Sequence, residues 1–538
     1  MMALKDSGRA KTGILRGALI GLVLAGGVSQ IAEAQTATPK RGGTVVFATG
    51  ADPVTLSRNF GSNTTDGFIA CILYQGLTRI DAKGDVQPML AKSWTTSPDG
   101  KTFSFDLVKA NWQDGKPFTS EDVKYSLIQI SAKYSSIFAG AGAVIDTIET
   151  PAPDKAIIRL KQPYGPFLLS LACPQGGAIL PKHVYEGTNP PTNPATTSTP
   201  VGLGPFILKE WKRGDYLRMV KNPDYWEPGK PYLDEVIAKV LPQPSTRTQA
   251  LQAGEVDHVS YYYFPANDYG AVRADPKLRL TPSTAAPGVD YMFLNVKRKP
   301  FDDKRVRQAL MMATDREALL KTAYLGVGDV GTMPFTNKIK WSANPDIDFR
   351  KMYPFDPARA NALLDEAGVK RGADGIRFKA EVVFAADDPD PPLVAVALKS
   401  MWRNIGVDVV VSGLERVAAT KRMFEAMDGD VVLVGYTSFG DPALGIARAF
   451  VTSSIGKQFG NPSGYSNPEV DKLFEEGERA PTQEGRGVAY RKVQTILADD
   501  LPVFNLHERA LFDGITAKLH GIEDEFFLIS WRDAWIDK

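Results

Sequence analysis

Hydrophobic and polar residues follow two different periods along this chain, and the two periods predict strands and helices in alternation. In the second half, short apolar runs of β-favouring residues at 378–384, 407–411 and 431–434 indicate strands. Between them, apolar positions recur with a helical period at 393–405 and 416–427. Strands that alternate with helices form a parallel or mixed sheet with right-handed crossovers. We therefore predict a βαβαβ series that ends with the strand at 431–434.

The first half of the chain predicts shorter and more varied elements. A strand at 44–48 is followed by a polar loop and by a helix whose apolar face carries Ile69, Ile72 and Leu73. Asp99-Gly100 lies between two segments rich in β-favouring residues, which is typical of a hairpin. With 538 residues, the chain is too long for one core and long enough for two or three lobes.

The sequence changes character directly after residue 434. Four aliphatic residues give way to glycine, aromatic side chains, hydroxyls and a carboxylate. Open α/β sheets bind ligands at the carboxyl ends of their strands, so this change indicates a site, although an ordinary polar loop would have the same composition. The candidate ligand contacts at this strand end are Tyr436, Thr437, Ser438, Phe439 and Asp441.

The N-terminus has the pattern of a secretory signal. Residues 1–34 combine a basic start, an apolar stretch at 17–28 and the small-x-small sequence Ala32-Glu33-Ala34. The apolar stretch is too short to span a bilayer. We therefore predict cleavage before Gln35 and a protein exported to the periplasm. Because Gln35 is not a cysteine, we expect no lipid anchor.

Charge and cysteine content limit the remaining possibilities. Lys and Arg (63) nearly balance Asp and Glu (62), and no basic block marks a nucleic-acid surface, so we predict no nucleic-acid partner. Cys71 and Cys173 are the two cysteines, and both lie in apolar, helix-like contexts. In an oxidising compartment they can pair, but buried free thiols agree equally well with these contexts.

Motifs for catalysis, metals or cofactors are absent or fail in their context. His507-Glu508 begins like a zinc-protease motif, but Leu511 stands where the second histidine is required. Gly326, Gly328 and Gly331 match a dinucleotide-binding pattern, yet they follow a predicted helix rather than a strand. We interpret the acidic run 387–390 as a solvated turn before a helix rather than as a calcium site. We predict no catalytic residue, no metal and no cofactor. A secreted hydrolase stays as an alternative, because the carboxylate pair of a glycosidase leaves no short motif.

Nine short segments, read together in their order along the chain, carry a resemblance. They include Trp112-Gln-Asp-Gly-Lys-Pro-Phe118, Pro200-Val-Gly-Leu-Gly-Pro-Phe206 and Asn222-Pro-Asp-Tyr-Trp226. The others are residues 74–77, 90–94, 97–100, 251–257, 301–310 and 363–368. This series resembles the bacterial extracellular solute-binding proteins of family 5, which are the receptors of peptide, nickel and related ABC importers.

The resemblance implies an α/β, two-lobed periplasmic-binding-protein fold of type II, with an extra small subdomain and closure around a hinge. The first lobe is expected to hold residues 35–80, 190–285 and 500–538. The small subdomain is expected at 81–190 and the second lobe at 286–499. Closure over a buried ligand is favoured by ligand contacts to both lobes.

The resemblance also bears on the site. In the peptide-binding branch, an aspartate shortly after the strand equivalent to 431–434 takes the ligand's α-amino group. Here the aligned position is Ser438 or Phe439, and Asp441 comes later, so that carboxylate is displaced or missing. In the first lobe, the resemblance points to Asn63 and Thr64 as ligand contacts, while a helix N-cap explains the same residues.

The function implied by the resemblance is the solute-binding component of an ABC importer. It would act as a monomer without catalysis, capture a di- or oligopeptide or a peptide-like solute, and deliver it to the permease and ATPase of the inner membrane. A buried ammonium without a carboxylate partner is costly, so the departure at Ser438 and Phe439 raises the alternatives of an opine, a sugar or a chelate.

Overall fold

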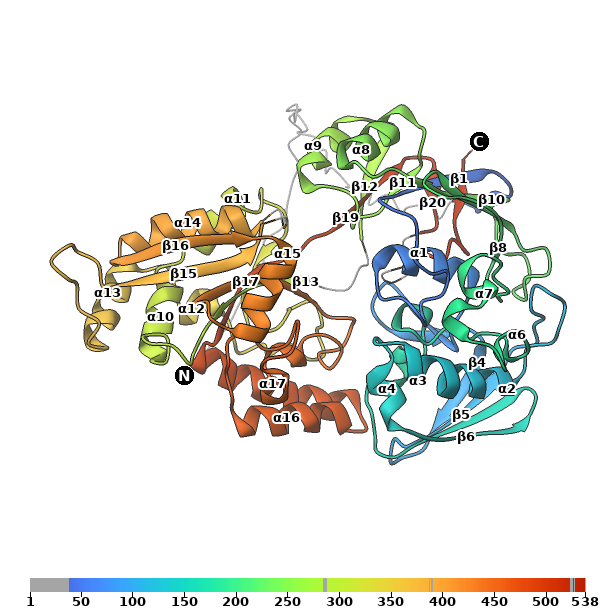
Figure 1. Cartoon of the computed structure of the whole chain (residues 1–538), viewed down its shortest axis with the longest axis horizontal. Coiled ribbons are helices and arrows are strands. Elements are labelled where there is room, and N and C mark those ends of the chain that lie inside the picture. The colour runs from blue at the N-terminus through green and yellow to red at the C-terminus, as the bar shows by residue number, and fades with distance from the viewer. Residues whose placement is uncertain are drawn as a thin grey trace, which may run out of the picture. The chain divides into compact units, whose positions relative to one another are not determined.

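The computed structural model of this chain describes residues 38–283, 288–386, 388, 390–522, 526 and 528–537. The predicted signal sequence, residues 1–34, lies outside the described residues. The part of the chain from Lys40 onward forms one unit, which contains two large sheets and one smaller sheet (Figure 1). None of the described helices is long and apolar enough to cross a membrane.

The first large sheet combines early, middle and late segments of the chain. At its centre, β1 (Thr44–Thr49) runs parallel to β10 (Glu235–Val240) and β11 (His258–Val259). The outer strands are β12 (Leu278–Pro282), β19 (Phe512–Thr516), β9 (Tyr216–Lys221) and β8 (Phe206–Lys212). Because β19 comes from the C-terminal part, the chain returns to this sheet after the second large sheet is complete.

The second large sheet contains the predicted βαβαβ series. Strand β15 (Phe378–Ala385) pairs in parallel with β16 (Val407–Leu414) and with β17 (Val431–Thr437), which confirms that prediction. Helix α14 (Pro391–Arg403) connects the first pair, and α15 (Arg416–Thr420) precedes β17. The sheet is mixed, because β17 is antiparallel to its other neighbour. The remaining strands are β13 (Gly288–Leu294), β18 (Val503–Glu508) and β14 (Asp329–Val330).

Strand β17 is longer than its apolar run predicts. Tyr436 and Thr437 lie within the strand, whereas the sequence placed them in a loop after residue 434. Antiparallel pairing with β13 explains the difference, because Val289 lies opposite Tyr436 and Gly288 lies opposite Thr437. A neighbouring strand thus satisfies the backbone groups of Tyr436 and Thr437, which follow the glycine at which the predicted strand ended.

Between β1 and β8, the chain forms a four-stranded antiparallel sheet. It consists of β4 (Ala91–Thr96), β5 (Thr102–Leu107), β7 (Lys155–Leu160) and β6 (Ile145–Ala152), in that order. Asp99 and Gly100 form the turn between β4 and β5, as the hairpin signal predicts. Two-stranded pairs are formed by β2 (Thr78–Ile80) with β3 (Val86–Pro88), and by β20 (Leu519–His520) with β21 (Trp535–Ile536).

The helices fall into two groups, one in the first part of the chain, which precedes β13, and one in the second part, which begins with β13. The helices of the first part are α1 (Thr64–Leu73), α2 (Ser120–Tyr125), α3 (Ala132–Tyr134), α4 (Ala139–Val144), α5 (Phe167–Ser170), α6 (Lys182–Tyr185), α7 (Pro194–Thr197), α8 (Pro244–Ala253) and α9 (Tyr269–Ala274). Those of the second part, besides α14 and α15, are α10 (Lys304–Met312), α11 (Arg316–Thr322), α12 (Phe349–Met352), α13 (Pro357–Glu366), α16 (Pro468–Arg479) and α17 (Gln483–Asp500).

Both faces of the second large sheet are buried, which explains why β17 is apolar without alternation. Val431 and Leu433 pack into one hydrophobic cluster together with residues of α10, α13 and α14. Val432 and Tyr436 pack into another cluster, together with residues of α16 and α17. A strand covered on both faces requires apolar side chains at odd and even positions alike.

Two chain segments pass between the large sheets. One follows β12 and leads to β13, and the other follows β18 and leads to β19. Beside these passages, Ser283 N donates to Leu511 O (2.8 Å) and Arg509 N donates to Gly288 O (2.9 Å). The predicted lobe boundaries stay a prediction. Strand pairing nevertheless puts β18, and hence residues 503–508, in the second large sheet rather than in the first lobe, where the boundary at 500 placed them.

Cys71 and Cys173 form a disulfide, with their Cα atoms 5.8 Å apart. The bond joins α1 to the turn at residues 173–175, and both sulfurs lie in the hydrophobic core of the first large sheet. The sequence left the bridge and the free thiols open, and the structure decides for the bridge. It closes a loop of 102 residues, which limits the conformations of the unfolded chain.

Replacing both cysteines with alanine is expected to lower the free energy of unfolding by about 2–4 kcal/mol, because the unfolded chain regains the freedom of this long loop. Urea denaturation of the double variant and the parent measures the difference. Alkylation of the unfolded parent without reductant, followed by mass measurement, is the control. Two alkylated cysteines in that control would contradict the bridge.

Candidate ligand-binding site

Tyr436 lies in the core of the second large sheet. Its side chain is 2% exposed and packs beside Tyr291 and Phe293, with ring centroids 5.7 and 5.6 Å away. The hydroxyl donates to Gly460 O, and burial raises the pKa of Tyr436 above its usual value. In this structure Tyr436 therefore stabilises the strand rather than offering its ring to solvent.

Arg509 packs closely against β17 at residue 435, which is possible because this residue is a glycine. A Cβ on Gly435 would overlap Nη2 of Arg509. The glycine thus lets the guanidinium cross over the strand. The sequence showed the glycine but not the arginine that requires it.

The residues after β17 form a tight turn, which contacts segments that precede β13 in the chain. Ser438 is fully buried, and its hydroxyl donates to Asp441 O (3.2 Å). Thr437 is half-buried at the end of the strand. Phe439, together with Leu444, packs against a small apolar cluster, whose members are Ile80, Leu169, Ala172 and Phe526. Of the candidates on this strand end, Phe439 is the one whose ring contacts residues of the first part.

Asp441 is engaged by an arginine. Both of its carboxylate oxygens lie 2.6 Å from guanidinium nitrogens of Arg486, and both side chains are buried. Arg486 also donates to Gly477 O (2.6 Å) and lies over the ring of Trp341. The carboxylate therefore holds α17 against the turn after β17, and a ligand ammonium would have to compete with the guanidinium.

Asp441→Asn is expected to lower the free energy of unfolding by about 3 kcal/mol, because it leaves the charge of Arg486 buried without a counter-ion. The double variant Asp441→Asn/Arg486→Met removes that charge and is expected to recover part of the loss. Denaturant unfolding of the two single variants, the double variant and the parent completes the thermodynamic cycle. Equal stability of Asp441→Asn and the parent would contradict a structural role for the pair.

Asn63 and Thr64 begin α1. The Asn63 side chain accepts a hydrogen bond from Asp66 N (2.8 Å), and its amide donates to an Asp66 carboxylate oxygen (2.7 Å). Thr64 is the first helical residue and is half-buried. The structure therefore gives Asn63 the N-cap role that the sequence offered as the alternative, while its exposure leaves the ligand contact as a prediction.

A small, partly open cavity lies near the residues on which Phe439 packs. A cavity of about 50 Å³ is lined by Cys71, Tyr74, Gln75, Gly76, Thr78, Arg79, Ile80, Met89, Cys173, Pro174, Phe526, Leu528 and Ser530. Ile80 and Phe526 are also the residues on which Phe439 packs. Sites for small organic ligands typically occupy roughly 300–1,000 Å³, so this space is too small for a whole solute.

A charged cluster at the crossing between the sheets was missed by the sequence analysis. Asp290 accepts from His507 Nδ1 (2.8 Å) and from Arg509 Nε (2.8 Å). Burial raises the pKa of Asp290, but the charge of Arg509 and the hydrogen bond from His507 outweigh burial and lower it to about 2. The ring of Tyr324 stacks on His507. No short motif joins these residues, because they come from β13, β18 and the crossing segment.

Asp390 faces the same cluster from the start of α14. Its burial and the negative charge of Asp290 raise the pKa of Asp390 to about 6. The predicted turn at 387–390 does precede a helix, although the Asp390 side chain makes no capping hydrogen bond. Among the described acids of this turn, Asp388 pairs with Arg416 (2.6 Å).

Asp390→Asn is expected to raise the free energy of unfolding by about 1 kcal/mol above pH 6, a value reduced for partial exposure. The folded-state pKa lies above the unfolded value of 3.8, so the ionised carboxyl destabilises the fold as the pH rises from about 4 through 6. Denaturant unfolding at pH 8 and pH 4 checks this, and the gain is expected to vanish at pH 4. A gain of equal size at both pH values would contradict it.

Comparison with known proteins defines the class of this chain. The family model "Bacterial extracellular solute-binding proteins, family 5 Middle" matches residues 85–458. This match extends over more than half of the chain. The chain therefore belongs to the family 5 extracellular solute-binding proteins, as the sequence motifs indicated.

Relatives and solved structures cover nearly the whole chain. The oligopeptide-binding protein AppA of Bacillus subtilis is 28% identical over 88% of this chain and 87% of its own length. Heme-binding protein A of Haemophilus influenzae is 27% identical over 81% of each chain. The periplasmic binding protein DppA from Helicobacter pylori, solved with the peptide STSA, is 25% identical, with a TM-score of 0.74 over 93% of this chain and 99% of that one. The predicted α/β, two-lobed fold class is confirmed.

Proposed function

We propose that this protein is the periplasmic solute receptor of an ABC importer, which captures a di- or oligopeptide or a peptide-like solute and passes it to the permease and ATPase of the inner membrane. The solute-binding role is supported by the membership of this chain in family 5. The periplasmic location rests on the family and on the predicted signal at residues 1–34. The named relatives include oligopeptide and heme receptors, so peptides are the leading ligand class and not the only chemistry within the family.

The observation that best supports a receptor is the hinge-like connection between the large sheets. The chain passes between the two sheets twice, and beside these passages Ser283 is hydrogen-bonded to Leu511 and Gly288 to Arg509. A pair of short linkers lets two rigid bodies rotate about a line with few broken contacts. Ligand contacts to both bodies then favour the closed arrangement.

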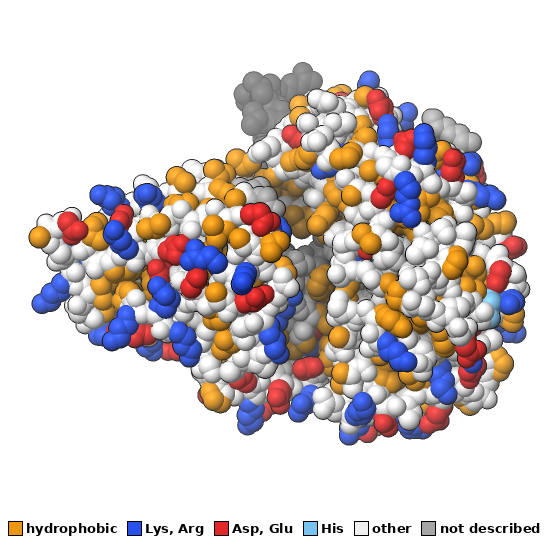
Figure 2. All heavy atoms as spheres, in the orientation of Figure 1, with side chains coloured by type: hydrophobic (Ala, Val, Ile, Leu, Met, Phe, Trp, Pro, Cys, Tyr) orange, Lys and Arg blue, Asp and Glu red, His pale blue; other side chains and the backbone are white. Residues whose placement is uncertain are grey.

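Three buried carboxylates are engaged by other side chains, which favours binding over hydrolysis at these positions. Asp290 and Asp441 are held by arginines, and Glu508 accepts from Thr336 Oγ1 (2.6 Å) and Asn505 Nδ2 (2.9 Å). A carboxylate-pair hydrolase needs two carboxyl groups that face one substrate bond across a gap. The visible face of the molecule also mixes acidic and basic side chains, which agrees with a small-molecule rather than a nucleic-acid partner (Figure 2).

A panel of di-, tri- and tetrapeptides, with opines and sugars for comparison, tests the function. We expect at least one peptide to raise the melting temperature of the purified protein, since ligand that binds only the folded state stabilises it. Mass spectrometry of the same samples after prolonged incubation is expected to recover the peptide intact. Cleavage would favour the secreted hydrolase, and stabilisation by opines or sugars alone would favour the non-peptide alternative.

Phe439→Ala is expected to weaken binding of the stabilising solute about tenfold, because the ring supplies apolar area where the solute enters. Phe355→Ala is the matched control, since Phe355 is 49% exposed, follows β13 in the chain and does not line the 50 Å³ cavity. Isothermal titration of both variants and the parent measures the difference. Equal affinities in all three would place the solute away from Phe439.

A further inference from the structure

Three segments that lie far apart in the sequence line the 50 Å³ cavity described above. One runs from the end of α1 to Met89, and the second is the turn that begins at Cys173. The third is a C-terminal stretch that contains Phe526. Because Ile80 and Phe526 also belong to the apolar cluster on which Phe439 packs, the cavity adjoins the candidate ligand-binding site.

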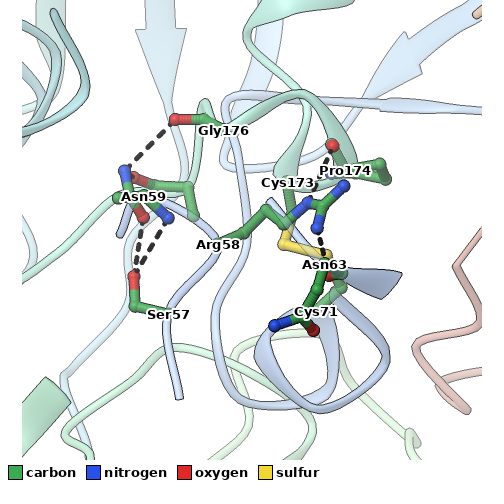
Figure 3. The surroundings of a disulfide bond; sticks show 9 residues. Ser57, Arg58, Asn59, Asn63, Cys71, Cys173, Pro174 and Gly176 are labelled. Carbon is green, nitrogen blue, oxygen red and sulfur yellow. Dashed lines mark hydrogen bonds between the residues drawn. A yellow bond between two sulfur atoms is a disulfide. The ribbon is translucent and has the colours of Figure 1, made fainter. Parts of the chain in front are cut away.

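The walls of this cavity are held in place. The disulfide joins Cys71 of the first segment to Cys173 of the second, and Figure 3 shows it beside Pro174, which also lines the cavity. Close by, the backbone is packed so tightly that a Cβ on Gly76 would overlap Leu171 O. Walls that are tied in this way limit how far the structure can relax around an empty space, so the space stays open.

The polar side chains of the lining are engaged with residues outside it. Tyr74, Gln75 and Thr78 each donate a hydrogen bond to an acceptor that does not line the cavity. These bonds are Tyr74 Oη to Ala195 O (3.0 Å), Gln75 Nε2 to Tyr225 Oη (2.6 Å) and Thr78 Oγ1 to Leu168 O (2.8 Å). Arg79 and Ser530, which also line the cavity, have partners as well. A water molecule in a cavity needs roughly two to four polar partners, so this lining favours an apolar group over water.

The rest of the lining is apolar. It consists of the disulfide, Gly76 and the side chains of Ile80, Met89, Pro174, Phe526 and Leu528. A water-sized group needs roughly 10–15 Å³, so a cavity of about 50 Å³ admits roughly three to five heavy atoms. That is the size of a valine or leucine side chain, and it is smaller than an aromatic ring. A group of this size gains dispersion contacts that the empty cavity lacks.

A larger cavity in the described part of the chain has a different chemistry. It measures about 450 Å³, and charged residues at α2 and α6 line it, among them Lys124 and Lys182. It shares no residue with the cluster on which Phe439 packs. An apolar group of a solute near Phe439 therefore has its match in the 50 Å³ cavity.

We propose that the 50 Å³ cavity binds a branched aliphatic side chain of the solute, of the size of valine or leucine, and that this contact selects among solutes. The inference rests on the proposed receptor function and adds which side chain the receptor recognises. It agrees with the chemistry after β17, where Asp441 is bound to Arg486 and the apolar ring of Phe439 packs beside the cavity. Selection then depends on the fit of an apolar group, and each carbon that is buried strengthens binding.

A series of tripeptides tests the proposal. Trialanine is compared with the three peptides in which one alanine is replaced by leucine, so that each position is sampled. By isothermal titration, the parent is expected to bind one of these peptides at least about tenfold more tightly than trialanine. The peptide with phenylalanine at that position is expected to bind less tightly than the leucine peptide. Equal binding of trialanine and all three leucine peptides by the parent, which needs no variant, overturns the proposal.

Two substitutions at Met89 change the size of the cavity in opposite directions. Met89→Trp fills it and is expected to lose the preference for leucine, whereas Met89→Ala enlarges it and is expected to shift the preference to phenylalanine. Met333→Ala is the matched control, because Met333 is 7% exposed, against 6% for Met89, and does not line the cavity. This control is expected to keep the preference of the parent. An unchanged preference for leucine in either folded Met89 variant overturns the proposal.

Xenon separates this proposal from the choice of peptides as the solute. If no peptide of the series binds, the chemical shift of dissolved xenon is titrated with the parent, Met89→Trp and Met333→Ala, because xenon occupies apolar cavities. Binding by the parent and by Met333→Ala that is lost in Met89→Trp supports the apolar site, while the peptide assignment fails. Equal shifts with all three proteins overturn the apolar site as well.

Discussion

The connection between the two large sheets is the constraint on which the rest of this structure depends. Because β12 leads to β13 and β18 leads to β19, the chain passes between the sheets twice, and beside these passages Ser283 is hydrogen-bonded to Leu511 and Gly288 to Arg509. This arrangement lets each sheet complete its own core. It also concentrates charge at the crossing, where Asp290 holds Arg509 and His507.

Buried ion pairs and aromatic packing give the residues at the end of β17 a role in stabilising the fold. Tyr436 and Ser438 are buried, and Asp441 is bound to Arg486. Phe439 alone among these residues packs on segments near the disulfide. The polar residues that looked like ligand contacts in the sequence thus shape the turn, and the turn presents one aromatic ring.

Periodicity in the sequence was sufficient for the regular parts of the fold. The βαβαβ series, the hairpin at Asp99-Gly100 and the helix cap at Asn63 follow from local preferences, and the ordered motifs identified the family. The extension of β17 could not be predicted, because it depends on pairing with β13. The partner of Asp441 and the cluster at Asp290 lay out of reach for the same reason. Each joins residues separated by 45 or more positions, and no local pattern encodes such contacts.

The disulfide determines how the small antiparallel sheet is attached to the rest of the chain. All four strands of the small antiparallel sheet, β4 to β7, lie between Cys71 and Cys173, and the bridge fixes the two ends of that segment 5.8 Å apart at their Cα atoms. The small antiparallel sheet is thus an insertion within the chain of the first large sheet, and the disulfide joins the two ends of this insertion. The bridge therefore holds the start and the end of this segment together independently of the residues between them.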